Sequence, residues 1–281
     1  MSGRNLLLTG VPRSGTTLCC RLLGQASDTV ALFEPMHVLD LPTEQTAARQ
    51  EVEIFLAGSR ASLASDRTAW SQQVAGAVPD NPFSSHRDSA GRRRHEAVRG
   101  RIAVDKPLGE DFTLVIKHNA AFTALLPELV RHHEVRAIVR NPLAVLASWY
   151  SVDLPVSRGR LPAGEHLDPA LAQRLDGEPD RLARQLLILD WFFERYQRCL
   201  PPECVLSYEE IIAGAGRPLA EAFVLDLPSL PLQERNASHL YDVETCERLT
   251  EGLLADNGAW RSRYGDAEVV GLLQRLRDGL V

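Results

Sequence analysis

The feature that most constrains this chain is a glycine-bearing turn between two short apolar segments near its start. Residues 5–9 form an apolar run that is typical of a buried strand. After the turn, Leu18, Leu22 and Leu23 have the spacing of one face of a helix, which we expect over residues 16–25. A strand, a turn and a helix in this order open a βα unit, and the turn lies where such units bind anions.

The rest of the chain repeats this alternation of strand and helix. Further apolar runs predict strands at residues 30–33, 114–116, 135–139 and 205–207. Periodic runs predict helices at residues 119–131, 143–151 and 180–199, and two more at 242–255 and 267–278. The alternation predicts an α/β fold in which helices flank both faces of a parallel sheet.

One segment, about residues 41–105, departs from the alternation. It holds an amphipathic helix at about residues 43–63, then a passage rich in Pro, Ser and Asn, then the run Arg92-Arg93-Arg94. We expect a helical and loop lid here, inserted on the substrate side of a single domain that spans residues 1–281. The arginine run has two interpretations, a solvated loop or a substrate-binding patch.

Charge and cysteine content narrow the classes of function. A net charge of -6 over 281 residues argues against bulk nucleic-acid binding but allows a local basic site for a small anion. The five cysteines form no CxxC pair, which suits a reducing compartment. The apolar runs are too short for a membrane span or a signal sequence. We therefore expect a soluble, cytoplasmic protein without a nucleic-acid partner, and leave its oligomeric state open.

Residues 10–17, Gly-Val-Pro-Arg-Ser-Gly-Thr-Thr, form the turn itself. Their glycine spacing is that of the Walker pattern GxxxxGK[ST], with one departure. Thr16 stands where the pattern has the lysine that reaches the β- and γ-phosphates of a nucleoside triphosphate. Arg13 supplies a cation within the loop instead. The turn therefore predicts an anion site that differs from that of an ATP-driven phosphoryl transferase.

A second motif follows the strand predicted at residues 135–139. Arg140 comes at the carboxyl end of this strand, where open α/β sheets place ligands, and Pro142 opens the next helix. Ser148 follows about two helical turns later. Arginine can bind a phosphate through two parallel N–H bonds, and a hydroxyl adds a further donor. The motif therefore predicts a second anion site.

Together the two motifs resemble those of the sulfotransferases that use 3'-phosphoadenosine-5'-phosphosulfate (PAPS), with the bacterial and carbohydrate branches most similar. The resemblance implies a P-loop-type sheet, PAPS as donor substrate, and sulfuryl transfer without a metal ion. It implies that Arg140 and Ser148 hold the 3'-phosphate. The residues that it implies for the 5'-phosphate and the sulfuryl group are Arg13, Ser14, Gly15, Thr16 and Thr17.

Transfer to a hydroxyl needs a general base, and cations near the sulfuryl oxygens. Glu34, in Phe-Glu-Pro-Met, resembles the Phe-Glu-Pro-Leu element of carbohydrate sulfotransferases, and is our first candidate for the base. His118 is the second, because Ile-Lys-His resembles the Ile-Lys-Thr-His stretch of the cytosolic branch. By that resemblance Lys117 contacts the sulfuryl group. The stretch is one residue shorter here, and a slip of one residue turns a strand side chain to the other face.

Two C-terminal segments also resemble the family. Tyr208 and Glu209 match a strand-to-helix segment, in which we expect Tyr208 to pack and Glu209 to form an ion pair. Arg261 and Arg263 follow a Gly-x-Trp element and are candidates to complete the 3'-phosphate site.

Two rival functions share parts of this pattern. One is a P-loop kinase or nucleotide-binding protein that uses ATP, against which stands Thr16 at the Walker lysine position. The other is a non-catalytic nucleotide sensor, which has no need of Glu34 or Lys117. For a sulfotransferase, the Phe-Glu-Pro element favours a small-molecule acceptor with a hydroxyl or amine, of the carbohydrate or glycolipid class.

Overall fold

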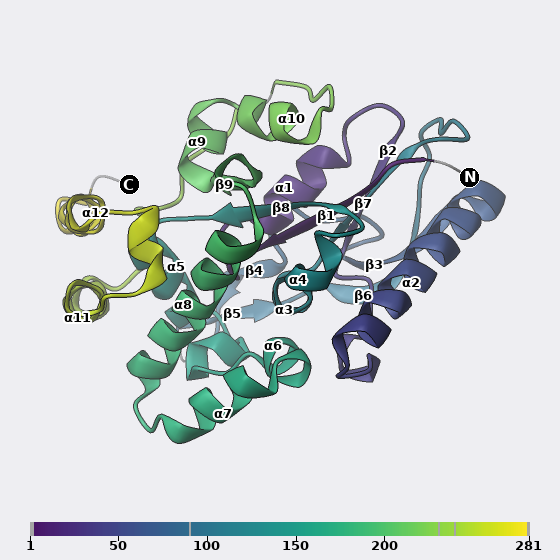
Figure 1. The fold of residues 1–281 in the computed structure, drawn as a ribbon. Helices are drawn as coiled ribbons and strands as arrows, with labels where there is room; N and C mark the ends of the chain where they lie inside the picture. The colour runs from purple at the N-terminus through teal and green to yellow at the C-terminus, as the bar shows by residue number, and fades with distance from the viewer. Residues whose placement is uncertain (1–2, 90, 230, 239, 280–281) are drawn as a thin grey trace.

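The strands predicted from the apolar runs form one parallel sheet. The structure, a computed structural model, describes residues 3–89, 91–229, 231–238 and 240–279. Within these residues the sheet has the order β2-β7-β1-β8-β9 (Figure 1). Its strands are β1 (Asn5–Gly10), β2 (Thr29–Phe33), β7 (Thr113–Lys117), β8 (Glu134–Val139) and β9 (Val205–Ser207). Each contains one of the predicted runs, and every pairing is parallel, which confirms the predicted sheet.

Successive residues of a strand point to opposite faces of the sheet. The strands carry apolar side chains on both faces, and helices cover each face. In β1, Leu6 and Leu8 belong to a cluster with α1 (Thr16–Leu23), α9 (Tyr208–Ala213) and α10 (Arg217–Phe223). Leu7 belongs to the larger cluster on the opposite face. The helices of that cluster include α2 (Gln45–Asp66), α3 (Ala120–Ala124), α4 (Leu126–Leu129), α5 (Pro142–Tyr150), α6 (Pro162–Leu167), α7 (Pro169–Gly177), α8 (Arg181–Cys199), α11 (Val243–Ala255) and α12 (Asp266–Arg277).

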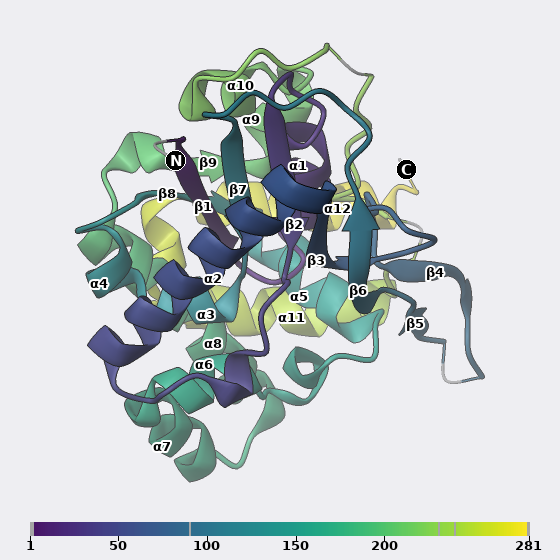
Figure 2. The ribbon, with the colours of Figure 1, turned by 90° about the vertical axis from the view of Figure 1, so that its right-hand side faces the viewer.

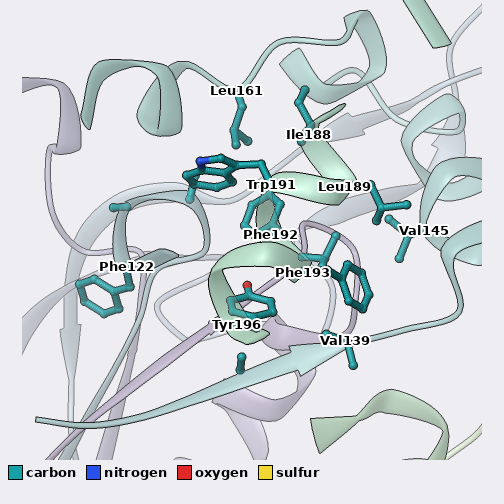
Figure 3. Packing of buried hydrophobic residues seen from close by; sticks show 14 of the residues in the cluster. Phe122, Val139, Val145, Leu161, Ile188, Leu189, Trp191, Phe192, Phe193 and Tyr196 are labelled. Carbon is teal, nitrogen blue, oxygen red and sulfur yellow. The ribbon is translucent and has the colours of Figure 1, made fainter. Parts of the chain in front are cut away.

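Helix α8 contributes large aromatic side chains to the larger cluster. Trp191, Phe192 and Phe193 are buried on it, and Figure 3 shows them beside Tyr196. The Tyr196 hydroxyl lies 3.0 Å from that of Thr123, which lies 2.8 Å from the Thr9 hydroxyl. Each of these buried hydroxyls therefore has a hydrogen-bond partner among the other two. They join α8 to the end of β1, one residue before the glycine turn.

The helix predicted at residues 119–131 is divided in two. It consists of α3 and α4, separated at Leu125, and Pro127 lies in the first turn of α4. Proline has no N–H to donate to the preceding turn, so a continuous helix would lose a hydrogen bond there. The other predicted helices are continuous and end within about three residues of the predicted positions.

The segment of residues 41–105 has two parts. Its helix α2 places Val52, Leu56 and Leu63 in the main core, so this helix is part of the core and not of an inserted lid. The second part forms two antiparallel ribbons, which lie on one side of the molecule (Figure 2). They are β3 (Thr68–Gln73) with β6 (Val98–Ala103), and β4 (Phe83–Arg87) with β5 (Arg93–His95).

Short 3-10 helices complete the structure. They are η1 (Val38–Asp40), η2 (Pro155–Arg158), η3 (Pro202–Cys204) and η4 (Ala259–Ser262). Across the part of the chain that the structure describes, no helix is both long enough and apolar enough to cross a membrane.

Candidate active site

A cavity of about 1170 Å³ opens at the carboxyl ends of the sheet strands. Its lining includes Arg13 after β1, Glu34 after β2, Lys117 at the end of β7 and Arg140 after β8. Open α/β sheets bind ligands at this edge, where the strand order changes direction. Pockets for one drug-sized ligand have volumes of about 300–1,000 Å³. The cavity therefore has room for more than one small substrate.

The first predicted loop is fixed to β8 and α5. The Ser14 hydroxyl donates to the Ile138 carbonyl at 2.8 Å, and the Trp149 indole donates to the Pro12 carbonyl at 2.8 Å. Arg13, Gly15, Thr16 and Thr17 line the cavity, whereas Ser14 is fully buried beneath them. Ser14 therefore gives its side chain to β8, and its backbone N–H donates to the Val11 carbonyl at 3.0 Å, so the cavity is left to the other four predicted loop residues.

Two features of the structure favour glycine at position 15, its backbone conformation and the close approach of Tyr208. Its φ is +95°, a left-handed conformation that favours glycine. A Cβ added here would lie 2.6 Å from Cδ2 of Tyr208. Helix α1 begins at the next residue and has no acidic side chain in its first turn. The positive end of the helix dipole and the backbone N–H groups therefore face the cavity without a competing carboxylate from that turn.

The second motif is joined to the first through Arg13. Nε of Arg13 donates to the Ser148 hydroxyl at 3.1 Å, and Nη1 of Arg140 donates to the Arg13 carbonyl at 3.0 Å. Arg140 also donates to Oδ1 of Asn236 at 2.6 Å and to the Arg235 carbonyl. Because a guanidinium has five N–H donors, two of those on Arg140 remain for a ligand. Arg140 lines the cavity, whereas Ser148 is buried and reaches it through Arg13.

Positive charge accumulates around Arg13. Burial lowers the pKa of its guanidinium, and the charges of Arg93, Arg140 and Arg235 lower it further. Within the described residues, neither Arg13 nor Arg140 forms an ion pair with a carboxylate. Buried charges are stable when an opposite charge pairs with them, so this cluster favours the binding of an anion.

Glu34 and Lys117 form an ion pair at the edge of the cavity. Nζ of Lys117 donates to Oε1 of Glu34 at 2.6 Å, and it lies 4.5 Å from the centre of the Phe33 ring. Burial alone would raise the pKa of Glu34, but the charges of Lys117 and His118 and the Lys117 hydrogen bond bring it below its ordinary value. Glu34 is therefore a carboxylate at neutral pH. Its φ of +40° is rare for a residue with a side chain and is a form of backbone strain that often marks functional sites.

His118 lies beside this pair, where it is buried and also lines the cavity. Its Nε2 accepts a hydrogen bond of 3.1 Å from the Met36 amide, and its ring packs edge-on against Phe122. Burial lowers the pKa of His118 to about 4. The imidazole is therefore neutral at pH 7, and the lone pair that a general base would use is already bonded to the backbone.

Apolar side chains form another part of the cavity wall. The Leu41 carbonyl accepts a hydrogen bond from His166 at 2.8 Å, which ties the end of η1 to α6. The apolar residues that η1, η2, α6 and their flanking positions contribute to the wall include Val38, Leu39, Leu154, Val156, Leu161 and Ala163. This wall suits an apolar ligand surface, unlike the cationic wall around Arg13.

Two groups of lining residues were not predicted from the sequence. One is the irregular segment before α11, from which Arg235, Ser238 and Tyr241 line the cavity. The other is β5, which contributes Arg93 and His95. The irregular segment has no periodic pattern that could have revealed it. The run Arg92-Arg93-Arg94 was the one sequence signal for β5.

The C-terminal candidates lie elsewhere. Arg261 forms an ion pair with Asp266 and donates to the Asp256 carbonyl, and Arg263 donates to the Pro202 carbonyl. Neither arginine lines the cavity.

Glu209 does not have the role expected of it. Within the described residues it forms no ion pair. Its carboxylate accepts hydrogen bonds from the Asn141 amide, the Asn236 side chain, and the Ser207 and Tyr264 hydroxyls. Glu209 thus fixes Asn236, which in turn accepts from Arg140. Tyr208 packs as expected, beneath Gly15 and 4.5 Å from the Arg140 guanidinium.

Comparisons with known proteins complete the description of the site. No family model matches the sequence, and no curated protein matches it. Among solved structures, the chain is similar to the sulfotransferase STF1 from Mycobacterium tuberculosis H37Rv, at 15% identity and a TM-score of 0.40. The match covers 91% of this chain and 78% of that one. At this TM-score the likeness says nothing about the chemistry of the site.

Proposed function

We propose that this protein is a sulfotransferase that moves a sulfuryl group from PAPS to a hydroxyl or amine of a small-molecule acceptor. The observation that carries the proposal is the convergence of two anion-binding motifs on Arg13, which donates to Ser148 and accepts from Arg140. A donor with phosphates at its 5' and 3' positions needs two adjoining anion sites. The loop of residues 10–17 offers one, and Arg140 with Arg235 offers the other.

The residues at this edge fit such a donor. The first turn of α1 has no acidic side chain, and Arg13 and Arg140 supply positive charge without carboxylate partners among the described residues. Thr16, in place of the Walker lysine, removes the group that would bind the γ-phosphate of ATP. Bound PAPS would supply a sulfuryl group on a phosphate leaving group.

Glu34 is the base that the surroundings favour. It is ionised at neutral pH, it lines the cavity, and its carboxylate has a second oxygen beyond the one that Lys117 bonds. Glu34 accepts the proton of the acceptor hydroxyl as that oxygen bonds to sulfur. The bond between sulfur and the phosphate oxygen breaks, and the electron pair goes to the phosphate. Lys117 and Arg13 stabilise the charge on the sulfuryl oxygens and the phosphate. His118, whose lone pair holds Met36, serves the site by positioning.

The apolar wall supports an amphiphilic acceptor. A bare sugar has little surface to match Leu39, Val156 and Leu161, whereas a glycolipid or a hydroxylated apolar molecule can place its apolar part there. The acceptor that the cavity favours therefore carries its reactive hydroxyl on an apolar body.

Thermal unfolding in the presence of nucleotides tests the proposal. At a hundredfold excess over its dissociation constant, a ligand stabilises the native state by about 2.7 kcal/mol. For a chain of this size this raises Tm by roughly 5 °C. We expect this shift with 3'-phosphoadenosine-5'-phosphate (PAP), a much smaller one with 5'-AMP, which lacks the 3'-phosphate, and none with Mg-ATP. A shift with Mg-ATP alone would overturn the proposal in favour of the kinase.

A further inference from the structure

The hairpin β4–β5 turns one arginine of the run Arg92-Arg93-Arg94 toward the cavity. Side chains on a strand point alternately to its two faces. On β5, Arg93 and His95 line the cavity, while Arg94 is exposed and does not line it. Arg92 lies at an ion-pair distance of 3.7 Å from Asp153. The sequence does not distinguish these three arginines. In the structure, Arg93 is the one of the three that lines the cavity.

Arg93 is held in place by the chain that follows α5. Its amide donates to the Ser151 carbonyl at 3.0 Å, and its Nη2 lies 3.3 Å from the Ser151 hydroxyl. The side chain is 7% exposed. Helix α5 also carries Ser148, and Arg140 precedes it. The position of Arg93 is therefore fixed relative to the same helix that organises the second anion motif.

The guanidinium groups of Arg13 and Arg93 both lie against the ring of Phe83. The Arg13 guanidinium carbon lies 4.4 Å from the centre of the Phe83 ring, and that of Arg93 lies 5.9 Å from the same centre. Phe83 is buried and comes from the other strand of the hairpin. After burial, the charge of Arg93 is the largest cause of the lowered pKa of Arg13. Like charges that are shielded from water repel each other, and an anion in contact with both guanidinium groups would remove that cost.

We propose that Arg93 is a further binding residue for the polyanionic part of the donor, and that it clamps the donor together with Arg13. The inference rests on the proposed function for the identity of the nucleotide. The clamp itself is built for any compact phosphate-type polyanion. It gives the paired strands β4 and β5 a role, because β5 contributes a cation to the donor site from outside the parallel sheet.

Binding of two probes to matched variants tests this role. Dissociation constants of PAP and of inorganic pyrophosphate are measured by calorimetry for the wild type, R93Q, R93K and R94Q. Loss of one charge-assisted contact weakens binding about tenfold or more. We expect R93Q to weaken both probes by at least this factor, R93K to lie between R93Q and the wild type, and R94Q to stay within about twofold.

The outcomes of this experiment separate the role of Arg93 from the proposed function. If R93Q binds pyrophosphate as the wild type does, or if R94Q loses as much affinity as R93Q, Arg93 is not a binding residue. If the wild type binds pyrophosphate but not PAP, the proposed function fails, and the pyrophosphate series alone decides the role of Arg93. If it binds neither, both proposals fail. Far-ultraviolet circular dichroism and thermal unfolding without ligand show whether each variant folds, and R93K replaces R93Q in the comparison if R93Q does not.

Discussion

Lys117 and Glu34 share a hydrogen bond of 2.6 Å across the boundary between the core and the cavity. The Lys117 side chain is 2% exposed and that of Glu34 is 36% exposed, so the ammonium is buried and the carboxylate is partly exposed, although both residues line the cavity. The pair forms because the register of β2 and β7 sets Phe33 opposite Lys117. This arrangement keeps Glu34 ionised and leaves one of its oxygens available.

Replacing Glu34 by Gln tests its role as the base. Removal of a general base lowers turnover about 10²- to 10⁴-fold. We therefore expect E34Q to lose turnover of PAPS by at least 10², while its dissociation constant for PAP stays within about threefold of the wild type. The matched control is D40N, which neutralises an exposed carboxylate of the same cavity wall and is expected to keep most of the activity. Near-normal turnover by E34Q would remove Glu34 from the mechanism.

The unequal burial of the ion pair predicts unequal costs of breaking it. E34A leaves the buried Lys117 ammonium without its partner, whereas K117M leaves a carboxylate that water can reach. Unpaired buried charges are costly, although the partial exposure of Glu34 reduces the effect. We expect urea unfolding to give a loss of roughly 2–3 kcal/mol for E34A and about 1 kcal/mol for K117M. Equal losses, or a larger loss for K117M, would contradict the inward position of the ammonium.

His118 predicts a dependence of stability on pH. Its pKa is about 4 in the folded protein and about 6.5 in an unfolded chain. Between these values the unfolded state binds more protons, so the contribution of His118 is complete above pH 6.5 and is lost as the pH falls toward 4. From pH 7 to pH 5 this amounts to about 1–2 kcal/mol. H118Q should lack this component, whereas H132Q, at an exposed histidine, should keep the wild-type dependence. If the free energy of unfolding depends on pH in the same way for the wild type and H118Q, this role of His118 is contradicted.

Sequence reasoning predicted the candidate residues that follow strands of the sheet, and these residues line the cavity. Arg13, Glu34, Lys117 and Arg140 each come at the end of an apolar run, and the ends of parallel strands meet at one edge. It could not reveal that Arg13 joins the two motifs. That relationship depends on the side-chain bonds to Ser148 and on the Arg140 bond to the backbone.

The rest of the site lies on elements with weak sequence signals. Strand β5 has three residues, too few for an alternating pattern, so Arg93 could not be told from its neighbours. Arg235 lies in an irregular segment that no periodicity marks. Helix α2 was assigned to a lid because its segment departs from the alternation of strand and helix, yet one face of it packs into the main core. Long-range packing decided each of these positions.

The bond between Arg13 and Ser148 predicts coupled effects on donor binding. The hydroxyl accepts from Nε of Arg13, so S148A frees a guanidinium that the structure holds in place. We expect S148A to weaken PAP binding about three- to tenfold. In R13K, which has no Nε–H, the same change should have little effect, because residues that act through one contact are not additive. Calorimetry on the four proteins of this cycle measures the coupling. Independent effects would show that Ser148 acts on the donor by another route.

We expect G15A to lower the free energy of unfolding for two separable reasons, the contact with Tyr208 and the strained backbone. In G15A the new Cβ would meet Cδ2 of Tyr208 at 2.6 Å, and alanine would have to adopt a φ of +95°. We expect a loss of about 2–3 kcal/mol in urea unfolding. In a Y208A background the contact disappears, and G15A should cost only the backbone strain, about 1 kcal/mol. The control is G58A in α2, where a Cβ meets nothing within 4 Å. There alanine should raise stability by up to about 1 kcal/mol, because it favours the helix. An unchanged cost of G15A in the Y208A background would mean that the packing of Tyr208 against the loop is not what requires glycine.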